Sequence, residues 1–473
     1  MTYEINIGGV MKRLKVLVVS SEVAPFAKTG GLADVCGSLP LALESLGVDV
    51  RVIMPRYASV KCDGDYTVIG KNIKVYFVTN DYYFKRQELY GDKFGDYKDN
   101  LDRFAFFSKE ALERCRQEGF KPDVIHCNDW QSALVPVYLN TLYKYDPLFA
   151  ETKTLFTIHN LAYQGLFSKE EFYKIGLDWA LFNINYFEFY DKMNLMKAGI
   201  AYSDAISTVS PTYAKEILTK EFGCGLEGVL ATRKRSLYGI LNGIDTEAWD
   251  PKTDKKIYKN YSAKKIVDKY ANKELFQKEM GLKADSSVPL IGMVARLVDQ
   301  KGADLIADII DGLLNLKVQF ALLATGENRY HILFEKIAKK YSHNTSINLK
   351  FDAVLAQKIY AASDLFLIPS KYEPCGLGQM ISFRYGAIPV VRQTGGLKDT
   401  VEEYDVKTGR GNGFTFTEYE SKAFFAAIKK ALSVYNNNES WTALARRVMN
   451  LDYSWKSSAK EYVKLYNGIE KRQ

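Results

Sequence analysis

Cysteine and histidine are scarce in this sequence, and neither is spaced as a metal site or a disulfide framework requires. The 473 residues include six cysteines and four histidines, and no two cysteines have the C-x-x-C spacing. Disulfide frameworks and structural zinc sites need grouped cysteines, so both are disfavoured. No His, Cys or Asp cluster has ligand spacing either. We therefore expect chemistry without a metal, in a reducing cytoplasm.

Long apolar runs and blocks of like charge are also missing. No run approaches the roughly 20 apolar residues of a membrane helix, and residues 1–11 are too short and mixed for a secretory signal. Lys and Arg number 64 against 56 for Asp and Glu, but this surplus is spread along the chain. Such a distribution favours a local anion site over a nucleic-acid surface. Neither a membrane nor a nucleic acid is an expected partner.

The composition that remains is that of a large globular protein. Apolar residues make up 47% and charged residues 25%, and the chain is longer than one hydrophobic core usually holds. Apolar strand, helix and apolar strand follow one another at 16–19, 32–46 and 48–54, and a second such series starts at 290–294. Continuously apolar strands indicate parallel sheets covered on both faces. The sequence predicts an α/β fold of two doubly wound halves, joined near 242–252.

A Thr-Gly-Gly-Leu motif occurs once in each half, at 29–32 and at 394–397. Each copy lies between a predicted strand and a predicted helix, where glycine lets the backbone approach an anion and the helix dipole favours negative charge. A tight turn explains either copy alone equally well. Two copies, one of them preceded by Lys28, favour a phosphorylated ligand. Neither loop is G-x-G-x-x-G and no G-x-x-x-x-G-K-[ST] segment occurs, which disfavours nicotinamide enzymes and P-loop ATPases.

Three charged residues follow buried strands of the second half. Arg296 and Lys301 lie between a predicted strand and a helix, and Glu373 follows the predicted strand 364–369. In a doubly wound sheet such strand ends border the ligand crevice. Two cations there can neutralise a departing phosphate, and a carboxylate can stabilise positive charge at an anomeric carbon. Solvated cations and a carboxylate that complements a helix dipole are the alternatives.

Histidines and aromatic residues mark the first half. His126 and His159 lie at predicted strand ends, and Asn128 shares one of these ends. A lone histidine there is more often a hydrogen-bonded structural residue than a catalyst. The segment 80–107 is rich in Tyr and Phe, whose faces can stack on sugar rings, although core packing explains several of them equally well.

At the end of the chain, aromatic residues at helical spacing predict an amphipathic helix over 454–469.

Taken together, these segments resemble the family of bacterial glycogen synthases and plant starch synthases over nearly the whole chain. The resemblance implies the GT-B architecture, in which two doubly wound Rossmann-like domains face each other across a deep cleft. It implies an acceptor domain at 11–245, completed by a C-terminal helix at 454–473, and a nucleotide-sugar domain at 252–453. The segments that carry it are, in order, 28–35, 99–104, 126–130, 157–165, 242–245, 296–302, 373–377 and 394–397.

The resemblance also implies a reaction. Members of this family transfer glucose from ADP-glucose to the non-reducing end of an α-1,4-glucan, with retention of configuration and release of ADP. The expected partners are therefore a nucleotide sugar and a glucan, with neither a metal nor a cofactor. The choice between ADP-glucose and UDP-glucose stays open. So do the oligomeric state and the choice between free cytoplasmic action and association with glycogen particles or starch granules.

The family's site residues carry over to the positions that match its motifs. The implied catalytic residues are Glu373, Lys301, Arg296 and Asn128. The implied donor-binding residues are Lys28, Gly30, Gly31, Asp34, His159, Phe351, Cys375, Gly376, Leu377, Thr394, Gly395 and Gly396. The implied acceptor-binding residues are Asn100, Arg103 and Tyr163. Bacterial members commonly have histidine at the position of Asn128, whereas some plant relatives have asparagine. The resemblance to retaining enzymes of this architecture implies that the residue acts through its backbone carbonyl, which asparagine also supplies, and it disfavours a side-chain acid or base role.

Other functions stay open on the sequence alone. The nearest is another retaining glucosyltransferase of the same architecture, one that makes sucrose or trehalose phosphate, although the long aromatic segment favours a polymer acceptor. A glycogen phosphorylase would carry pyridoxal phosphate on a lysine. A catalytically silent glucan-binding protein would bind glucan without releasing ADP, but all the charged residues of the implied site are present.

Overall fold

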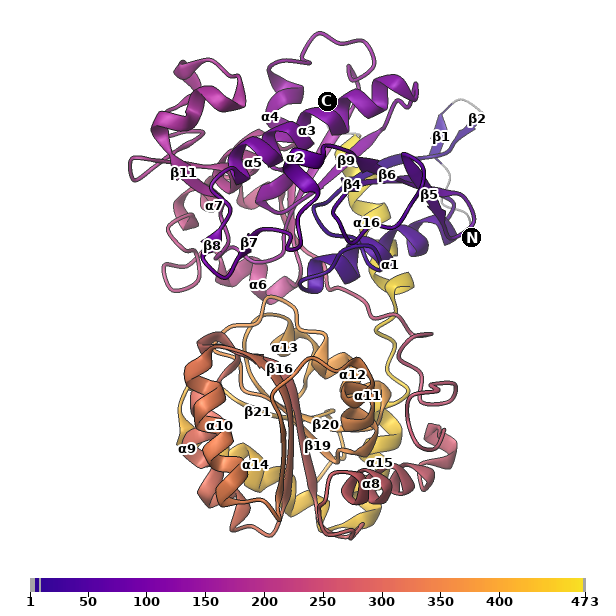
Figure 1. Cartoon of the computed structure of the whole chain (residues 1–473). Coiled ribbons are helices and arrows are strands. Elements are labelled where there is room, and N and C mark those ends of the chain that lie inside the picture. Colours follow the sequence, from indigo (N-terminus) through magenta and orange to yellow (C-terminus); the bar gives the residue numbers. More distant parts are fainter. Residues whose placement is uncertain (1–4, 8–9, 471–473) are drawn as a thin grey trace. The chain divides into compact units, whose positions relative to one another are not determined.

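The chain folds into two compact units. The computed structural model describes residues 5–7 and 10–470. The N-terminal unit holds the described residues up to Gly243 and those from Trp455 onward, and the C-terminal unit is Ile244–Ser454. The chain thus leaves the first unit once and returns to it at its end. Each unit is built on a mainly parallel sheet flanked by helices, which confirms the predicted α/β class (Figure 1).

In its described part, the N-terminal unit has an eight-stranded sheet in the order β15-β14-β10-β9-β3-β4-β6-β5. Neighbouring strands pair in parallel, except that β5 runs antiparallel to β6. The central strands are buried along nearly their whole length, as expected for a sheet covered on both faces. The bounds are β3 Lys15–Val19, β4 Asp49–Pro55, β5 Tyr66–Ile69, β6 Ile73–Val78, β9 Val124–Asn128, β10 Lys153–Ile158, β14 Ala205–Thr208 and β15 Leu237–Gly239.

The last helix of the chain belongs to this unit. Helix α1 (Gly31–Ser45) connects β3 to β4, and α16 (Trp455–Glu470) packs against it (Figure 1). Trp455, Tyr462 and Tyr466 of α16 are buried, so the aromatic residues of the predicted C-terminal helix form the packing face. The other helices are α2 Asp81–Phe84, α3 Asn100–Gln117, α4 Leu134–Asn140, α5 Leu195–Tyr202, α6 Pro211–Glu216 and α7 Glu227–Thr232. Short strands are β1 Ile5–Ile7, β2 Val10–Lys12, β7 Gly91–Asp92, β8 Gly95–Asp96, β11 Leu166–Ser168, β12 Glu188–Phe189 and β13 Lys192–Asn194.

The C-terminal unit contains a six-stranded sheet in the order β18-β17-β16-β19-β20-β21, parallel throughout. Its helices follow from helical spacing of apolar residues, and in α9 the side chains of Leu305, Ile306, Ile309 and Leu313 are buried. The strands are β16 Leu290–Leu297, β17 Gln319–Gly326, β18 Thr345–Asn348, β19 Leu365–Ile368, β20 Ile388–Arg392 and β21 Phe414–Phe416. The helices are α8 Asp268–Glu279, α9 Ala303–Leu314, α10 Asn328–Lys340, α11 Ala353–Ala362, α12 Gly378–Arg384, α13 Gly395–Thr400, α14 Ser421–Tyr435 and α15 Asn438–Val448.

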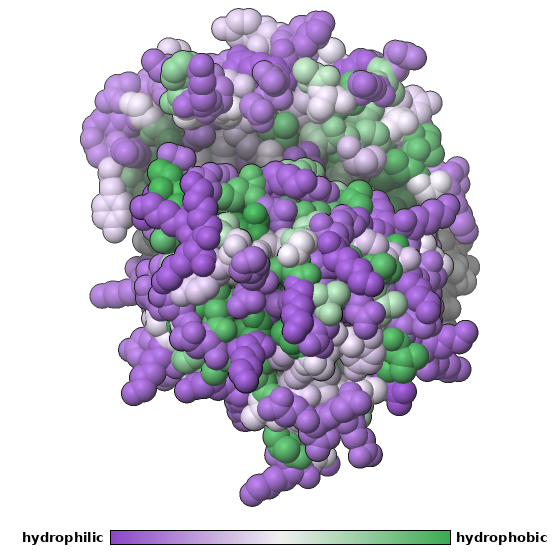
Figure 2. Space-filling model, turned by 60° about the horizontal axis from the view of Figure 1, so that its bottom comes forward, coloured by the Kyte–Doolittle hydropathy of each residue, from purple (hydrophilic) through white to green (hydrophobic). Residues whose placement is uncertain are grey.

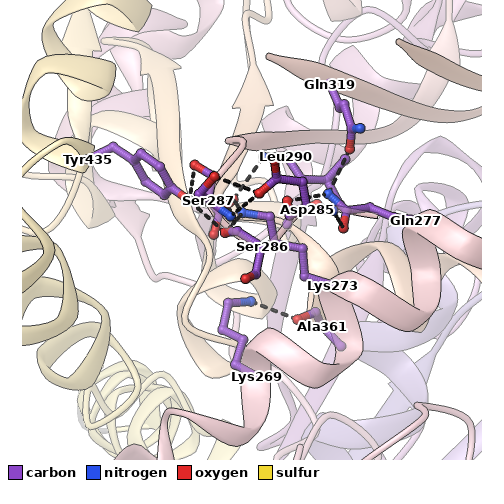
Figure 3. Close-up of polar contacts among 12 residues, drawn as sticks. Lys269, Lys273, Gln277, Asp285, Ser286, Ser287, Leu290, Gln319, Ala361 and Tyr435 are labelled. Carbon is purple, nitrogen blue, oxygen red and sulfur yellow. Dashed lines mark hydrogen bonds and ion pairs between the residues drawn. The ribbon is translucent and has the colours of Figure 1, made fainter. Parts of the chain in front are cut away.

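Two buried lysines of α8 attach this helix to the amino-terminal edge of the sheet (Figure 3). Nζ of Lys273 lies 2.6 Å from Oδ2 of Asp364, which also accepts from the backbone N–H of Leu290 at 2.8 Å. Nζ of Lys269 donates to the Ala361 carbonyl oxygen at 2.8 Å. Buried charges must be paired or neutral, and here Lys273 has a carboxylate whereas Lys269 has carbonyl oxygens. The loops at the opposite edge of the sheet stay available for a site.

Lys269 gives the fold a pH-dependent stability. Burial lowers its pKa from 10.5 to about 7, so between these values the unfolded chain holds a proton that the folded chain does not. The free energy of unfolding then rises with pH, by up to about 1.4 kcal/mol per pH unit. The thermal midpoint of Lys269→Met minus that of the wild type should be largest below about pH 7. This difference should become smaller as the pH rises toward about 10. The exposed Lys278 on the same helix supplies the control, Lys278→Met. A pH-independent difference would contradict a buried neutral lysine.

The surface in view in Figure 2 is mainly hydrophilic, and hydrophobic residues appear between the polar ones in small groups. Within residues 5–7 and 10–470, we find no helix that combines the length and the apolar character needed to cross a membrane.

Candidate active site

The strand order of the C-terminal unit creates a switch point between β16 and β19. From β16 the chain moves outward through β17 and β18, and it returns with β19 to the other side of β16. In such sheets ligands bind outside the carboxyl ends of the strands at the switch point. Arg296 is near the end of β16, and Ser370 and Glu373 follow β19. The topology therefore brings charged residues from distant parts of the sequence to one edge.

Lys301 and Glu373 form an ion pair at this edge. Nζ of Lys301 lies 2.6 Å from Oε2 of Glu373, and the Ser370 hydroxyl donates to the same oxygen at 2.9 Å. The carboxylate is buried, whereas the lysine side chain is partly exposed. The side-chain amide of Gln300 donates to the Tyr372 carbonyl oxygen at 3.2 Å and joins the two loops. Two of the residues that the resemblance implies for catalysis thus lie in direct contact.

A pocket of about 200 Å³ adjoins this pair. Its polar lining comes from Lys301, Ser370, Glu373 and Gln379, and its apolar lining comes from residues of β16 and β19. Gly376 and Leu377 also line it, and the neighbouring Cys375 is buried. A small concave site with a few convergent polar groups suits one polar ring or phosphate group.

Two further residues expected at the donor lie exposed at the same edge of the sheet. Arg296 is exposed near the end of β16. Phe351 follows β18 and is 85% exposed. A guanidinium that faces water can pair with a phosphate, and an exposed aromatic ring can stack on a planar base. The structure therefore leaves both side chains accessible to a ligand.

The second Thr-Gly-Gly motif packs backbone to backbone against the loop that carries Glu373. A Cβ atom on Gly395 would overlap the Glu373 carbonyl oxygen, and one on Gly396 would overlap the Cys375 carbonyl oxygen. The N–H of Gly396 donates to the carbonyl oxygens of Glu373 and Pro374 at 3.1 and 3.2 Å. Close packing thus explains these glycines. Donation by Gly396 to a phosphate would require those bonds to open, and it stays a prediction.

The first Thr-Gly-Gly motif is less closely packed than the second. It follows β3, which lies beside β9 at the switch point of the N-terminal sheet. A Cβ atom on Gly30 or Gly31 would meet no atom within 4 Å, so packing does not require glycine here. Nζ of the half-exposed Lys28 lies 2.6 Å from Oδ1 of Asp34, in the first turn of α1. The Gly30 N–H donates to Oε2 of Glu22 at 3.3 Å, and the open space beside Gly31 and the exposed cation suit an anionic ligand.

Asn128 and His159 are bonded to each other at the ends of β9 and β10. Nε2 of His159 lies 2.9 Å from Oδ1 of Asn128, whose amide nitrogen donates to the Val19 carbonyl oxygen at 3.2 Å. Burial lowers the pKa of His159 to about 3, so the ring is neutral and its Nε2–H donates to the amide oxygen. The Asn128 backbone oxygen accepts from the Ser132 hydroxyl at 2.9 Å. A further bond from this carbonyl to a substrate stays a prediction.

Asp129, which follows Asn128, is held in a strained conformation. Its φ of 56° and ψ of 179° are rare for a residue with a side chain. Its Oδ1 accepts from the backbone N–H of His159 at 2.8 Å, and burial raises its carboxyl pKa to about 7. Strain and a shifted pKa are typical of functional groups. The implied site residues did not include Asp129, although its place directly after a buried strand was a usable signal.

His126 is a structural residue. Its Nδ1 lies 2.8 Å from the Tyr466 hydroxyl of α16, and its Nε2 lies 2.5 Å from the Thr157 hydroxyl. The ring is fully buried, and burial lowers its pKa to about 3. Both ring nitrogens are satisfied inside the protein, so His126 ties the C-terminal helix to β9 and β10.

The three residues expected at the acceptor differ in exposure. Tyr163 is 56% exposed, whereas Asn100 and Arg103, in α3, are buried. The Arg103 guanidinium donates to Oδ1 of Asn100 at 2.6 Å and to the Tyr83 carbonyl oxygen at 2.7 Å, and the Asn100 amide donates to the Tyr90 carbonyl oxygen at 2.8 Å. These two side chains thus bind backbone carbonyl oxygens of the aromatic segment 82–97. Direct contact with an acceptor stays a prediction for all three residues.

In the described residues, 5–7 and 10–470, the His, Cys, Asp and Glu side chains form no group of three or more that could hold a metal ion. Positively charged side chains lie at the expected donor positions of each unit. In the C-terminal unit these are Lys301 and Arg296, and in the N-terminal unit it is Lys28.

Comparison with known proteins agrees with this geometry. A family described as the starch synthase catalytic domain matches residues 15–232, and one described as glycosyl transferases group 1 matches residues 276–448. The glycogen synthase of Thermosipho melanesiensis is 49% identical over 479 residues, which cover 96% of this chain and 98% of that protein. This chain belongs to the glycogen and starch synthase family. Another member, glycogen synthase 2 of Geobacter sulfurreducens, is 48% identical over 96% of this chain and 98% of its own length.

Solved structures place the fold in the same family. The catalytic domain of starch synthase IV from Arabidopsis thaliana, bound to ADP and acarbose, superposes with a TM-score of 0.90 at 38% identity, covering 98% of this chain and 100% of that one. A sucrose-phosphate synthase from Thermosynechococcus elongatus has a TM-score of 0.64 at 16% identity, which shows a shared fold. The two Rossmann-like units thus confirm the GT-B fold class.

Proposed function

We propose that this chain transfers glucose from ADP-glucose to the non-reducing end of an α-1,4-glucan, with retention of configuration and release of ADP. The membership in a family of glycogen and starch synthases supports this reaction. The observation that carries the proposal is the ion pair of Lys301 with Glu373, beside a pocket of about 200 Å³ at a switch point. When the bond between glucose and diphosphate breaks, negative charge grows on the diphosphate and is stabilised by a cation. Positive charge grows on the glucosyl group and is stabilised by a nearby carboxylate.

In the proposed donor complex, Lys301 and Arg296 hold the diphosphate, and Phe351 stacks on the base. The backbone at Cys375, Gly376 and Leu377 lines the glucose pocket. In the N-terminal unit, Lys28 and the open backbone at Gly30 and Gly31 contribute to binding the diphosphate, and Asp34 binds the sugar. Because side chains supply this positive charge, the proposal includes neither a metal nor another cofactor.

The chemical step breaks the bond between C1 of glucose and the β-phosphate oxygen, and the electron pair leaves with ADP. The O4 atom of the acceptor forms the new bond to C1 from the same face, and its proton passes to the departing phosphate oxygen. Positive charge builds at C1 as the bond breaks, so the buried Glu373 carboxylate stabilises the transition state more than the ground state. Lys301 and Arg296 stabilise the negative charge on the leaving group.

The reaction is tested by measuring nucleotide release with each donor. We expect ADP release from ADP-glucose that depends on glycogen or on maltooligosaccharides, with α-1,4-linked product. A parallel reaction with UDP-glucose measures donor preference. Glucan binding without nucleotide release from either donor would contradict the proposal and favour a silent glucan-binding protein. Release of ADP or UDP with fructose 6-phosphate or glucose 6-phosphate as acceptor would favour the sucrose or trehalose phosphate alternative.

Replacing Asp129 should increase the stability of the fold and decrease the activity. The folded chain keeps the proton on this carboxyl up to about pH 7, whereas the unfolded chain releases it near 3.8. The folded state therefore binds more protons in this window, and the group's contribution to stability falls as pH rises. Asp129→Asn keeps an acceptor for the His159 N–H and removes the charge. Its thermal midpoint relative to the wild type should rise between about pH 4 and pH 7 and level off above that, while its kcat should fall. A pH-independent midpoint difference would refute the raised pKa.

The proposed place of action is the cytoplasm, on glycogen particles or starch granules that present many non-reducing ends. The proposed partners are the nucleotide sugar and the glucan. Sedimentation of the purified chain with glycogen, with and without ADP-glucose, measures whether the protein stays with its polymer between transfers.

A further inference from the structure

The loop between β3 and α1 is closed by a buried carboxylate. Glu22 lies at its start and is 3% exposed. Its Oε2 accepts from the backbone N–H groups of Thr29 at 2.5 Å and Gly30 at 3.3 Å, and its Oε1 accepts from the Thr29 hydroxyl at 2.6 Å. These partners lie at the end of the same loop, and Gly30 is also the first of the two glycines with an open Cβ position. The carboxylate thus determines where the Gly30 backbone lies.

A fourth donor to this carboxylate comes from a different segment. The Tyr90 hydroxyl donates to Oε1 of Glu22 at 2.7 Å and lies 2.7 Å from the Ser21 hydroxyl. Burial, followed by the charges nearby, raises the pKa of Tyr90 well above 10, so this hydroxyl keeps its proton. A carboxylate has about four acceptor positions, and four donors fill them here.

Tyr90 continues the network to α3. Its carbonyl oxygen accepts from the Asn100 amide at 2.8 Å, and Asn100 accepts from Arg103 at 2.6 Å. Asn100 and Arg103 hold the aromatic segment 82–97, from which Tyr82 and Phe94 project into solvent. One chain of hydrogen bonds therefore runs from the glycine loop, through Glu22, to the aromatic segment.

We propose that Glu22 is a positioning residue that couples the glycine loop, which contributes to the donor site, to the aromatic segment, which faces the glucan. This inference rests on the proposed function, because it assigns one substrate to each end of the network. Every contact in it lies within the N-terminal unit. Since both the Thr29 and the Tyr90 hydroxyl bind Oε1, a shift of either partner changes the geometry available to the other. A change in the aromatic segment should therefore alter donor binding.

The test is a double-mutant cycle of Thr29→Val and Tyr90→Phe. Each variant removes one hydroxyl from Oε1 and keeps the size of the side chain. We expect Tyr90→Phe to raise the KM for ADP-glucose as well as that for glucan, and the two substitutions to combine non-additively by about three-fold or more in kcat/KM. In a Glu22→Gln background this non-additivity should shrink, because glutamine keeps only one acceptor oxygen and its NH2 group must face donors that bind the carboxylate in the wild type.

Controls separate coupling from a loss of packing. Tyr97 lies in the same segment, but its ring contacts the guanidinium groups of Arg86 and Arg103 and its hydroxyl is not part of this network. Tyr97→Phe should therefore leave the KM for ADP-glucose unchanged. Thermal midpoints of all variants report any general loss of stability. If Glu22→Gln does not fold, the cycle of the other two variants still decides the question.

Two results would overturn the inference. One is strict additivity, with Tyr90→Phe acting only on glucan and Thr29→Val only on ADP-glucose, since Glu22 would then only close its own loop. The other is an equal effect of Tyr97→Phe on the KM for ADP-glucose. Failure of the proposed function is distinguishable, because the wild type would then release no nucleotide from either donor. In that case the same cycle is measured on the affinity for ADP by calorimetry, where additivity again overturns the coupling.

Discussion

Replacing Lys301 with alanine is expected to lower the kcat of glucosyl transfer by about 100- to 1,000-fold, the usual effect of removing one preorganised charge from a developing anion. The ammonium group lies 2.6 Å from Glu373 at the switch point of the C-terminal sheet and lines the pocket beside it. Without it, the diphosphate departs with less compensation for its charge. Initial rates of ADP release at saturating glycogen measure the effect, and the affinity for ADP should fall in parallel.

The matched control for this prediction is Lys371→Ala. Lys371 is an exposed lysine in the loop that also carries Glu373, so its removal changes net charge by the same amount. We expect its kcat to stay near the wild-type value. Removing Lys301 also leaves a buried carboxylate without its cation, which destabilises a fold, so thermal midpoints accompany the kinetics. Near wild-type turnover in a folded Lys301→Ala protein would show that this lysine does not hold the leaving group.

The sequence predicts the centre of each sheet better than its edges. Strands such as β3 and β16 are covered on both faces, so their residues are continuously apolar and the pattern is unmistakable. The strand β5 alternates between exposed and half-buried residues, and β18 is only partly buried. Edge strands of this kind pair on one side and pack on one face, which leaves too little apolar periodicity for detection.

The sequence predicts where the candidate site lies, but only some of the contacts within it. Strand ends at a switch point identify Lys301 and Glu373, because topology alone brings them to one edge. The two Thr-Gly-Gly motifs look alike in the sequence, yet Gly396 is needed for close packing whereas Gly30 faces open space. Glycine has both uses, and only the three-dimensional surroundings distinguish them.

Local sequence patterns do not predict hydrogen bonds between residues that are far apart in the chain. Glu22 and Tyr90 are separated by 68 positions, and no spacing rule connects them. The positive φ of Asp129 is likewise set by its neighbours, since nothing local favours that conformation for aspartate in this loop. A charged residue at or soon after the end of a buried strand is the one signal that points to Glu22 and to Asp129, and it applies equally to Lys301 and Arg296.

Substituting Glu373 with glutamine should lower kcat by about 100-fold or more while changing the KM for ADP-glucose little. The side chain is 9% exposed, glutamine matches its volume, and the amide oxygen still accepts from Lys301 or Ser370. What the variant loses is the negative charge near C1 of the glucosyl group. That charge matters most when C1 becomes positive, so the loss falls on the transition state and not on binding.

Two variants calibrate this result. Ser370→Ala removes one hydrogen bond to Oε2 and keeps the carboxylate, so its kcat should lie between those of the wild type and Glu373→Gln. Glu335→Gln removes an exposed carboxylate on α10 of the same unit and should leave kcat unchanged. A Glu373→Gln protein that loses ADP-glucose binding but keeps its kcat would assign this carboxylate to donor binding alone. Positive charge at C1 would then need another stabilising group.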